Sequence, residues 1–478
     1  MSGLFGVVSK KKDSCIDSLI YGTDYQAHMG SEYGGLAVLG NNSFARFIHR
    51  MSNANFRDKF FESIKNIEVH SGIGVISDLE EQPIYMKSKV GEFCIVTSGR
   101  IVNMEELAKE MMDAGICFSE FSKSHVNMTE LVARIVSTGQ TIQDGIKLMF
   151  GKIKGSCSLL ILTREGIYAA RDYFGRTALV LGQDSESFAI CSETCGFANL
   201  GYRTIRDLNP GEILLISDTE VKVLEPGYKE KKICTFLWIY TGFPSSSYEG
   251  LNSEIVRERS GKLLAKRDKG IKADLVAGVP DSGLAHAIGY SMESGIPFRR
   301  PLVKYTPTYG RSYAPPSQHL RNLTARMKLI AIKEVIEGNS LILLEDSIVR
   351  GTQLKNFTVE KIWNCGAKEI HVRPACPPLM FPCTYCNSTR TNSELITRRA
   401  IREIEGSDIE DISEYLDPTT EKYAKMIEWI RKYLNITSLK YQTLEDMIEA
   451  IGLPEENLCT YCWNGKGNGC KGCKKTED

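Results

Sequence analysis

The sequence lacks an excess of charge of either sign, because 59 basic residues balance 59 acidic residues in a chain of 478. Proteins that bind nucleic acid usually carry a basic surface, so we expect no nucleic-acid partner. The chain also lacks any run of about 18 apolar residues, the length that a membrane-spanning helix needs. Its apolar start, Met-Ser-Gly-Leu-Phe-Gly-Val-Val, is too short and uncharged for a secretory signal. These absences predict a cytoplasmic protein with no membrane partner.

Cysteine, in contrast, is abundant, with 15 residues. Disulfides are rare in the cytoplasm, so clustered cysteines there indicate metal or redox chemistry. Cys94, Cys157 and Cys191 lie in apolar strand-like runs and are predicted core residues. The C-terminal Cys459-Thr460-Tyr461-Cys462 differs, because Cys470-Lys471-Gly472-Cys473 follows it closely. Taken alone, this spacing allows a zinc site, a redox pair or chance.

The length suits two or three domains, and the pattern of elements divides the chain in two. Residues 1–225 show short strands, turns and a few helices, an order that predicts an α+β sandwich. Residues 226–478 contain, from about Ala273, strands that alternate with helices, which predicts an α/β domain with a doubly wound parallel sheet. We expect residues 226–260 to form a polar, serine-rich crossover, and the cysteines from about residue 454 to form a C-terminal tail.

One segment of the second part says most about function. Residues 341–353 predict a buried strand, then Glu345 and Asp346, then a small-residue turn that opens a helix. Open α/β sheets bind ligands at such strand ends. The turn offers backbone N–H groups and the hydroxyls of Ser347 and Thr352, which suit a phosphate. An acid pair beside a phosphate cradle predicts a sugar-phosphate site, with the carboxylates on the ribose hydroxyls and the loop on the 5′-phosphate.

The acid pair followed by Ser-Ile-Val-Arg-Gly-Thr resembles the PRPP-binding motif of the type I phosphoribosyltransferases, in the form found in glutamine PRPP amidotransferases. A second strand-end turn, Gly278-Val279-Pro280-Asp281-Ser282, lies upstream at the distance of a βαβ unit. The resemblance implies that Mg²⁺ is held by Ser282, Glu345 and Asp346. It implies that PRPP is bound by Asp281, Ser282, Glu345, Asp346, Ser347, Arg350, Gly351 and Thr352. Glu345 stands where the family usually has Asp, and Gln353 where it usually has Thr; we expect the site to tolerate both changes.

The long polar segment from Lys304 to Lys328 has no regular period. By itself it predicts either a solvated loop or a functional lid. It resembles the family's flexible loop in Gly310-Arg311-Ser312-Tyr313, in Pro316-Ser317-Gln318 and in Arg326-Met327-Lys328-Leu329. The resemblance implies that Lys304 and Arg311 are catalytic. The implied reaction is attack of ammonia at ribose C1 while pyrophosphate leaves, with Mg²⁺ and basic side chains absorbing its charge.

The same resemblance assigns four of the cysteines. It implies a structural 4Fe–4S cluster held by Cys234, Cys383, Cys459 and Cys462. Four thiolates from distant segments suit such a cluster, and zinc is the alternative. No role follows for Cys386, Cys470 and Cys473.

The first part of the chain resembles the family as well. Ser2-Gly3-Leu4-Phe5-Gly6 parallels its Cys-Gly-Ile-Val-Gly start, and Ser192-Glu193-Thr194-Cys195 and Pro210-Gly211-Glu212 match later landmarks. The resemblance implies the Ntn-hydrolase sandwich of class II glutamine amidotransferases over residues 1–225. A type I phosphoribosyltransferase domain with the cysteine-rich tail is expected over residues 226–478.

Four positions of the family's glutaminase site are replaced. Ser2 stands for the N-terminal cysteine nucleophile, and Ser77 stands for the arginine that holds the substrate carboxylate. Ser98, beside Gly99, replaces the oxyanion asparagine, and Met128 replaces the acid that holds the substrate amine. Losing one oxyanion donor alone costs about 10²–10³ in rate. We therefore predict that this domain does not hydrolyse glutamine.

Three hypotheses of function follow. The leading one is a PRPP-dependent phosphoribosyltransferase of purine biosynthesis that forms 5-phosphoribosylamine from ammonia, or uses another amine. The alternative is a non-catalytic paralogue that binds PRPP or nucleotides and regulates an active amidotransferase. The third is a Ser2-dependent amidase, since serine can serve as an N-terminal nucleophile. The basic loop with Lys304, Arg311, Arg326 and Lys328 favours the first, and the resemblance implies a homo-oligomer with purine nucleotide effectors.

Overall fold

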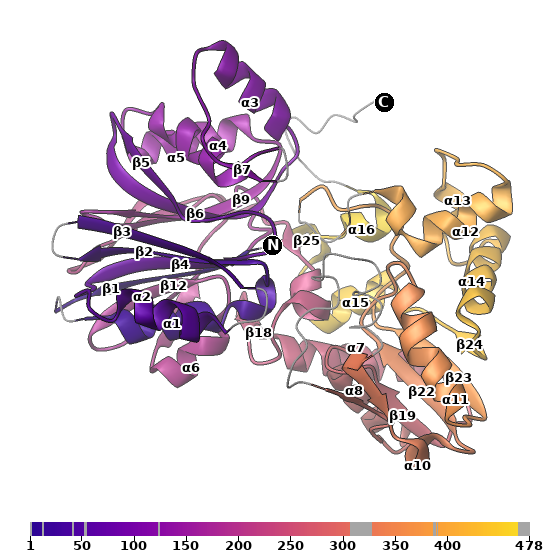
Figure 1. Ribbon diagram of the computed structural model, residues 1–478. Coiled ribbons are helices and arrows are strands. Elements are labelled where there is room, and N and C mark those ends of the chain that lie inside the picture. The colour runs from indigo at the N-terminus through magenta and orange to yellow at the C-terminus, as the bar shows by residue number, and fades with distance from the viewer. Residues whose placement is uncertain are drawn as a thin grey trace.

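The chain folds into two bodies that lie side by side (Figure 1). The computed structural model describes residues 2–11, 14–40, 43–51, 55–122, 125–305, 327–385, 389 and 391–466. Strands and helices up to residue 225 form the indigo-to-magenta body, and those from residue 253 onward belong to the rose-to-yellow body. Within the described ranges no helix is both long and apolar enough to cross a membrane.

The first body is built on two antiparallel sheets. The seven-stranded sheet has the order β13-β11-β12-β1-β4-β2-β3 and the six-stranded sheet the order β15-β14-β10-β9-β6-β5. The strands of the first sheet are β1 (Gly3–Ser9), β2 (Tyr33–Gly40), β3 (Ser43–Arg50), β4 (Ser71–Ser77), β11 (Val180–Gln183), β12 (Ser187–Cys191) and β13 (Arg203–Asp207). Those of the second are β5 (Ile84–Ser88), β6 (Gly91–Ile101), β9 (Gly155–Thr163), β10 (Gly166–Ala170), β14 (Ile213–Ile216) and β15 (Val221–Glu225).

Three apolar layers hold this body together, so it is a four-layer sandwich. The middle layer joins the two sheets through residues such as Leu4 and Leu160. One outer layer packs Leu19 and Phe60 of the helices against the first sheet. The other packs the second sheet against Leu131 and neighbouring helical residues. The helices are α1 (Ile16–Asp24), α2 (Phe56–Ile64), α3 (Met104–Asp113), α4 (Met128–Ser137), α5 (Ile142–Lys152) and α6 (Phe197–Leu200). Apolar side chains on both faces of each sheet are what a sheet covered on both sides requires.

The second body is organised around a parallel sheet of order β19-β22-β23-β24. Successive residues of β22 alternate between two cores: Leu341 and Leu343 face one, Ile342 and Leu344 the other. This alternation follows from the two-residue period of a strand, and it explains why the run is continuously apolar. The strands are β19 (Leu275–Gly278), β22 (Ser340–Glu345), β23 (Glu369–Pro374) and β24 (Ser438–Leu439). The long helices are α7 (Ser253–Arg267), α8 (Leu284–Ser294), α12 (Ile396–Glu405), α14 (Glu421–Leu434) and α15 (Leu444–Ile451).

Shorter elements complete the structure. The two-stranded ribbons are β7 (Phe121–Ser122) with β8 (His125–Val126), β16 (Ile233–Cys234) with β25 (Leu458–Cys459), β17 (Ser247–Tyr248) with β18 (Leu251–Asn252), and β20 (Leu302–Lys304) with β21 (Leu329–Ala331). The short helices are η1 (Ala27–Met29), η2 (Thr194–Gly196), η3 (Leu237–Thr241), α10 (Lys333–Ile336), η4 (Leu354–Val359), α11 (Glu360–Asn364), η5 (Asn392–Glu394), α13 (Ser413–Leu416), η6 (Glu455–Asn457) and α16 (Tyr461–Asn464).

The prediction of a polar crossover over residues 226–260 is wrong. This segment contains η3 and the start of α7, and Trp238 and Tyr248 are completely buried. Arg257 of α7 donates to the carbonyl oxygens of Trp238 at 2.7 Å and of Gly242 at 2.6 Å. The serines suggested a solvated link, but Trp238 and Tyr248 pack as core. The connection is therefore an ordered joint.

Candidate functional sites

Two strand ends meet to form the predicted sugar-phosphate site. β19 and β22 are parallel neighbours, with Gly278 paired to Leu344. Both strands end at the same edge of the sheet, so the loops that follow them lie together. The Ser282 hydroxyl donates to Asp346 Oδ1 at 2.6 Å. The structure thus brings the two sequence-predicted turns into direct contact.

At this edge Asp346 is buried and Glu345 is half-buried. Asp346 is only 4% exposed, and its second oxygen, Oδ2, accepts from the Ser347 hydroxyl at 2.7 Å. Burial and the adjacent charge of Asp346 raise the pKa of Glu345 well above its usual range. A carboxyl pair of this kind is stabilised by a nearby cation. Together with the Ser282 hydroxyl it supplies the oxygen ligands that Mg²⁺ prefers.

The loop after the acids forms the turn and following helix that its sequence predicts. Gly351 has a φ of +71°, and a Cβ placed there would lie 2.5 Å from Ile396 Cδ1. The left-handed φ favours glycine here, and a Cβ would also force the Ile396 side chain of α12 to move. Arg350, one of the predicted PRPP-binding residues, is exposed and donates to Glu394. Thr352, at the start of the following helical stretch, is exposed and accessible to a ligand.

The predicted catalytic lysine also lies at this edge. Lys304 ends β20, and its Nζ contacts Asp281 Oδ2 at 2.6 Å. Asp281 directly precedes Ser282, so Lys304 borders the same loop. Beyond Lys304, the backbone N–H of Tyr305 donates to the carbonyl oxygen of Lys328 at 2.8 Å, which closes the base of the long segment. Arg311 and Arg326 lie outside the described residues.

In the first body, three of the positions that are predicted to be replaced, Ser2, Ser77 and Ser98, come together as serine hydroxyls. The Ser2 hydroxyl donates to Ser77 Oγ at 3.2 Å, and the Ser98 hydroxyl donates to the Ser2 carbonyl oxygen at 2.6 Å. The Ser2 backbone N–H donates to Ser98 Oγ at 3.2 Å. All three side chains are buried, with exposures of 1–3%. Beside them, Gly99 cannot be replaced without conflict, because a Cβ would lie 2.0 Å from the Ser156 carbonyl oxygen.

An acid does lie at Met128, although it comes from another segment. The Glu80 carboxylate accepts from the backbone N–H of Met128 at 2.7 Å and from the Thr129 hydroxyl at 2.7 Å. Both oxygens of Glu80 are thus engaged at the start of α4. Burial raises the pKa of Glu80 to about 7. Matching the sequence to the family motif does not find Glu80, because this residue follows β4 and lies 48 residues before Met128 in the chain.

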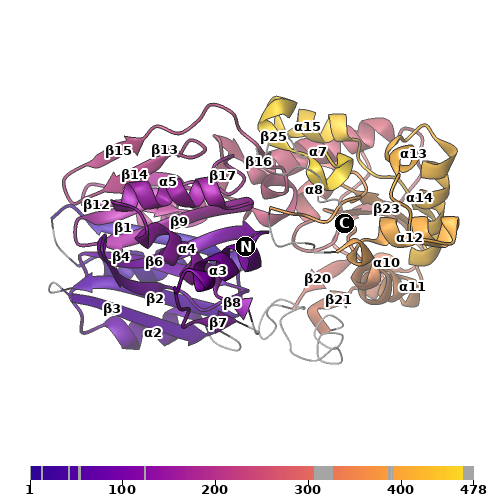
Figure 2. The same cartoon turned by 90° about the horizontal axis from the view of Figure 1, so that it is seen from above.

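The four predicted cluster ligands line one cavity. Cys234 and Cys459 are paired in register where β16 meets β25, a parallel contact that lies between the two bodies in both views (Figure 2). Cys383 and Cys462 line the same cavity. The remaining lining residues are Arg176, Thr235, Phe236, Tyr385 and Tyr461. Four sulfurs in one wall, beside three aromatic rings, are a donor set that fits a thiolate-bound metal or cluster. Cys386, Cys470 and Cys473 lie outside the described residues.

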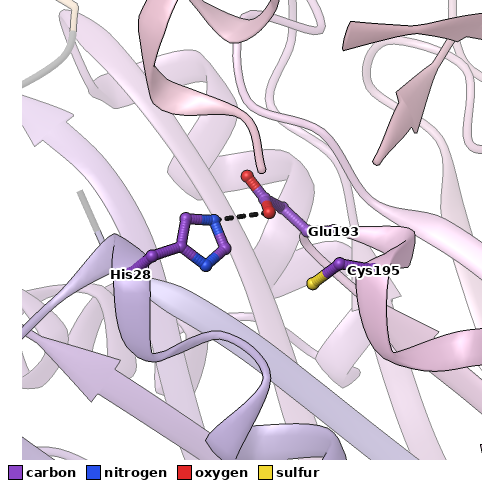
Figure 3. A group of neighbouring side chains, drawn as sticks. All are labelled: His28, Glu193 and Cys195. Atoms are coloured by element: carbon purple, nitrogen blue, oxygen red, sulfur yellow. Dashed lines mark ion pairs between the residues drawn. The ribbon is translucent and has the colours of Figure 1, made fainter. Parts of the chain in front are cut away.

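A further group of side chains, His28, Glu193 and Cys195, was not predicted as a site from the sequence (Figure 3). His28 Nε2 contacts Glu193 Oε2 at 2.5 Å, and one ligand-type atom each of His28, Glu193 and Cys195 lies within 4.8 Å of the others. Glu193 also accepts from the hydroxyls of Tyr248 and, at 3.2 Å, of Ser246. The carboxylate therefore fastens the joint segment to the sandwich. Residues 28, 193 and 248 are too far apart in the chain for any local pattern to reveal this contact.

Comparisons with known proteins cover nearly the whole chain. Residues 70–199 match the family described as a glutamine amidotransferase domain. A curated amidophosphoribosyltransferase from Methanocaldococcus jannaschii is 32% identical over 98% of this chain and 97% of the relative. Another, from Bacillus subtilis, is 31% identical over 80% of this chain and 76% of the relative.

Solved structures show the same two-part architecture. Glutamine phosphoribosylpyrophosphate amidotransferase from B. subtilis, complexed with ADP and GMP, matches with a TM-score of 0.82 at 28% identity, over 97% of this chain and 96% of that chain. A structure described as the allosteric regulatory enzyme of purine biosynthesis matches with a TM-score of 0.80 at 27% identity, over 97% of this chain and 95% of that chain. These matches confirm the predicted fold classes, an Ntn-type glutamine amidotransferase sandwich and a type I phosphoribosyltransferase domain.

Proposed function

This chain belongs to the amidophosphoribosyltransferase family, and we propose that it transfers the phosphoribosyl group of PRPP to ammonia, or to another small amine, without hydrolysing glutamine itself. The observation that carries the proposal is a contrast between its two halves. In the transferase half, Ser282, Asp346 and Lys304 lie around one strand edge. In the glutaminase-like half, Ser2, Ser77 and Ser98 bond to one another where the family's catalytic groups would stand.

The transferase residues suit displacement at ribose C1. The ammonia nitrogen attacks C1 as the bond from C1 to the pyrophosphate oxygen breaks, and the nitrogen then loses a proton to solvent. Mg²⁺, when bound, would neutralise charge on the leaving pyrophosphate. Ser282, Glu345 and Asp346 would hold that ion, and the ammonium group of Lys304 supplies a further positive charge beside Asp281. Catalysis of this kind rests on positioning and electrostatics, which rigid strand ends provide.

The glutaminase half offers little that recognises glutamine. Ser77 carries no charge for a substrate carboxylate, and the Ser2 hydroxyl is already bonded to it. The nearest acid to Met128 is Glu80, whose oxygens are engaged at the start of α4. A pocket closed by its own hydroxyls supports an inactive glutaminase and disfavours the Ser2-dependent amidase.

The cysteine cavity supports a 4Fe–4S cluster over zinc. A tetrahedral zinc site with Zn–S bonds of about 2.3 Å gathers its sulfurs about 3.8 Å apart. Among the described residues, only the His28, Glu193 and Cys195 group brings three ligand-type atoms within 4.8 Å of one another. No three sulfurs of Cys234, Cys383, Cys459 and Cys462 therefore lie within 4.8 Å of one another, which disfavours a single zinc ion, and we propose the larger cluster.

Three further parts of the proposal concern organisation. We place the domain boundary between residues 225 and 226, directly after the last sandwich strand. The solved B. subtilis relative contains ADP and GMP, and we propose purine nucleotide effectors and a homo-oligomer here too. A cytoplasmic location accords with the proposed activity.

A second candidate function is a non-catalytic paralogue that binds PRPP or nucleotides and regulates an active relative. The observation that favours it is Arg350, which contacts Glu394 and not the acid pair. A ligand would have to compete with Glu394 for this side chain. Exposed ion pairs contribute only about 0–1 kcal/mol, so this competition does not prevent PRPP binding, and we prefer the enzyme.

The deciding experiment measures pyrophosphate release from PRPP and Mg²⁺ by anaerobically purified protein, with ammonium chloride or glutamine as the nitrogen source. Release with ammonium alone is the expected result. Release with neither, together with PRPP binding in calorimetry, would establish the regulatory function. Release with glutamine would show that the first body is an active glutaminase.

A further inference from the structure

Arg176 is the one cation among the described residues that line the four-cysteine cavity. It comes from the sandwich, in the loop between β10 and β11, whereas all four cysteines belong to residues 226–478. Its side chain is 1% exposed. Arg176 therefore carries a buried positive charge from one body into a metal-type cavity of the other.

The guanidinium is held in place by aromatic rings. It lies 3.6 Å from the ring centroid of Tyr385 and 4.7 Å from that of Phe174. The backbone around it is tied down: the Lys232 N–H donates to the Phe174 carbonyl oxygen at 2.8 Å, and the Thr177 N–H donates to Asp172 Oδ2 at 2.9 Å. The Arg176 side chain is therefore held both at its backbone and at its guanidinium group.

The charge of Arg176 bears on the cysteines. Arg176 lines the same small cavity as Cys234, Cys383, Cys459 and Cys462, so its guanidinium lies beside the four sulfurs. A buried negative charge is stabilised by a nearby cation. Four thiolates around an iron–sulfur core leave a net negative charge, and such a site would benefit from a fixed cation.

We propose that Arg176 is the charge-compensating residue for the cluster held by Cys234, Cys383, Cys459 and Cys462. Through it, a sandwich without glutaminase chemistry would still serve the transferase half by stabilising its cluster. This inference rests on the cluster assignment made above. A second sandwich residue, Arg100 of β6, donates to the Cys383 carbonyl oxygen, so two arginines of the first body contact this site.

The test compares full-length Arg176→Met, which removes the charge but keeps much of the length, with Arg176→Lys, which keeps the charge. Arg402→Met, an exposed arginine of α12, is the matched control. Each protein is purified anaerobically and analysed for iron, sulfide and zinc. Iron release to a chelator is then timed, and the cluster potential is titrated with detection by electron paramagnetic resonance.

We expect Arg176→Met to release iron several-fold faster than wild type, and Arg176→Lys to recover most of the difference. Loss of a nearby positive charge should also disfavour the more negative, reduced cluster. At a fixed ambient potential the reduced-to-oxidised ratio should fall about tenfold, which corresponds to ~59 mV for a one-electron couple. A structural role alone would not lower the potential in Arg176→Met and restore it in Arg176→Lys.

The outcomes separate two kinds of failure. Wild-type protein that contains zinc and no iron would refute the cluster assignment, and this inference with it. An iron–sulfur cluster whose release rate and potential are the same in wild type and Arg176→Met would refute the role of Arg176 alone. Pyrophosphate release with ammonium is measured in parallel, so the transferase proposal is judged independently of both.

Discussion

The Ser282 hydroxyl donates to Asp346 Oδ1 at 2.6 Å, across 64 residues of sequence. This contact joins the loop after β19 to the loop after β22 and thereby sets the width of the transferase site. Because Ser347 holds the other oxygen of the same carboxylate at 2.7 Å, Asp346 is fixed at both oxygens. A carboxylate that is positioned before a ligand arrives needs little reorganisation when it binds one.

The first prediction concerns Asp346. Asp346→Asn removes a negative charge at the strand end but keeps the size of the side chain. We expect ammonium-dependent pyrophosphate release to fall by about 10²-fold or more, the scale of losing one electrostatic contact to a transition state. The exposed Glu403→Gln in α12 is the control. Unchanged release by Asp346→Asn would remove the acid pair from the mechanism.

The second prediction is a pH dependence. Because the pKa of Glu345 is raised in the folded protein, this carboxyl must lose a proton before it binds Mg²⁺, and Mg²⁺ affinity should increase as pH rises. Calorimetry in buffers of different ionisation enthalpy should detect the released proton. In Glu345→Gln the proton release should disappear, and a release as large as in wild type would assign the proton to another group.

The same shift affects stability in the metal-free protein. A raised folded-state pKa means that the folded protein binds a proton more tightly than the unfolded chain does. The resulting stabilisation is present below the unfolded value of about 4.3 and is lost as pH rises toward the folded pKa. Added Mg²⁺ should offset this loss. Denaturant titrations of wild type and Glu345→Gln, with and without Mg²⁺, measure both effects.

The third prediction concerns the serine group of the first body. On the proposed assignment, Ser2→Cys restores the family's nucleophile, while Ser77 and Ser98 supply neither the charge nor the amide that would hold glutamine. We expect no glutamate to form from glutamine in this variant. An enzymatic glutamate assay is sufficient, with ammonium-dependent activity as the control for folding. Glutamate production by Ser2→Cys would reveal a substrate pocket that the hydroxyl group conceals.

The fourth prediction concerns the joint. Glu193 is buried and is contacted by His28, Tyr248 and Ser246. Glu193→Gln should lower the free energy of unfolding by about 3 kcal/mol, because breaking a buried charge network leaves partners unsatisfied. Glu186→Gln, which removes an exposed pair with Lys11, should cost less than about 1 kcal/mol. Equal losses in urea denaturation would show that Glu193 does not hold the joint.

Local patterns were sufficient for much of the transferase half. A continuously apolar run such as Leu341–Leu344 is typical of a strand buried on both faces. A positive φ, as at position 351, favours glycine. Such requirements act on a residue and its chain neighbours. Local patterns gave the wrong prediction over residues 226–260. The many serines there suggested an exposed link, whereas Trp238 is buried in the core.

The sequence by itself determined the two fold classes and the order of strands and helices, and its resemblance to the family predicts a glutaminase site with replaced side chains. Only the tertiary structure decided that Ser2, Ser77 and Ser98 bond to one another, that Glu80 comes to Met128, and that Arg176 enters the cysteine cavity. The physical reason is that local structure depends on neighbours along the chain. Contacts between distant segments depend instead on strand register and domain packing, which no single segment encodes.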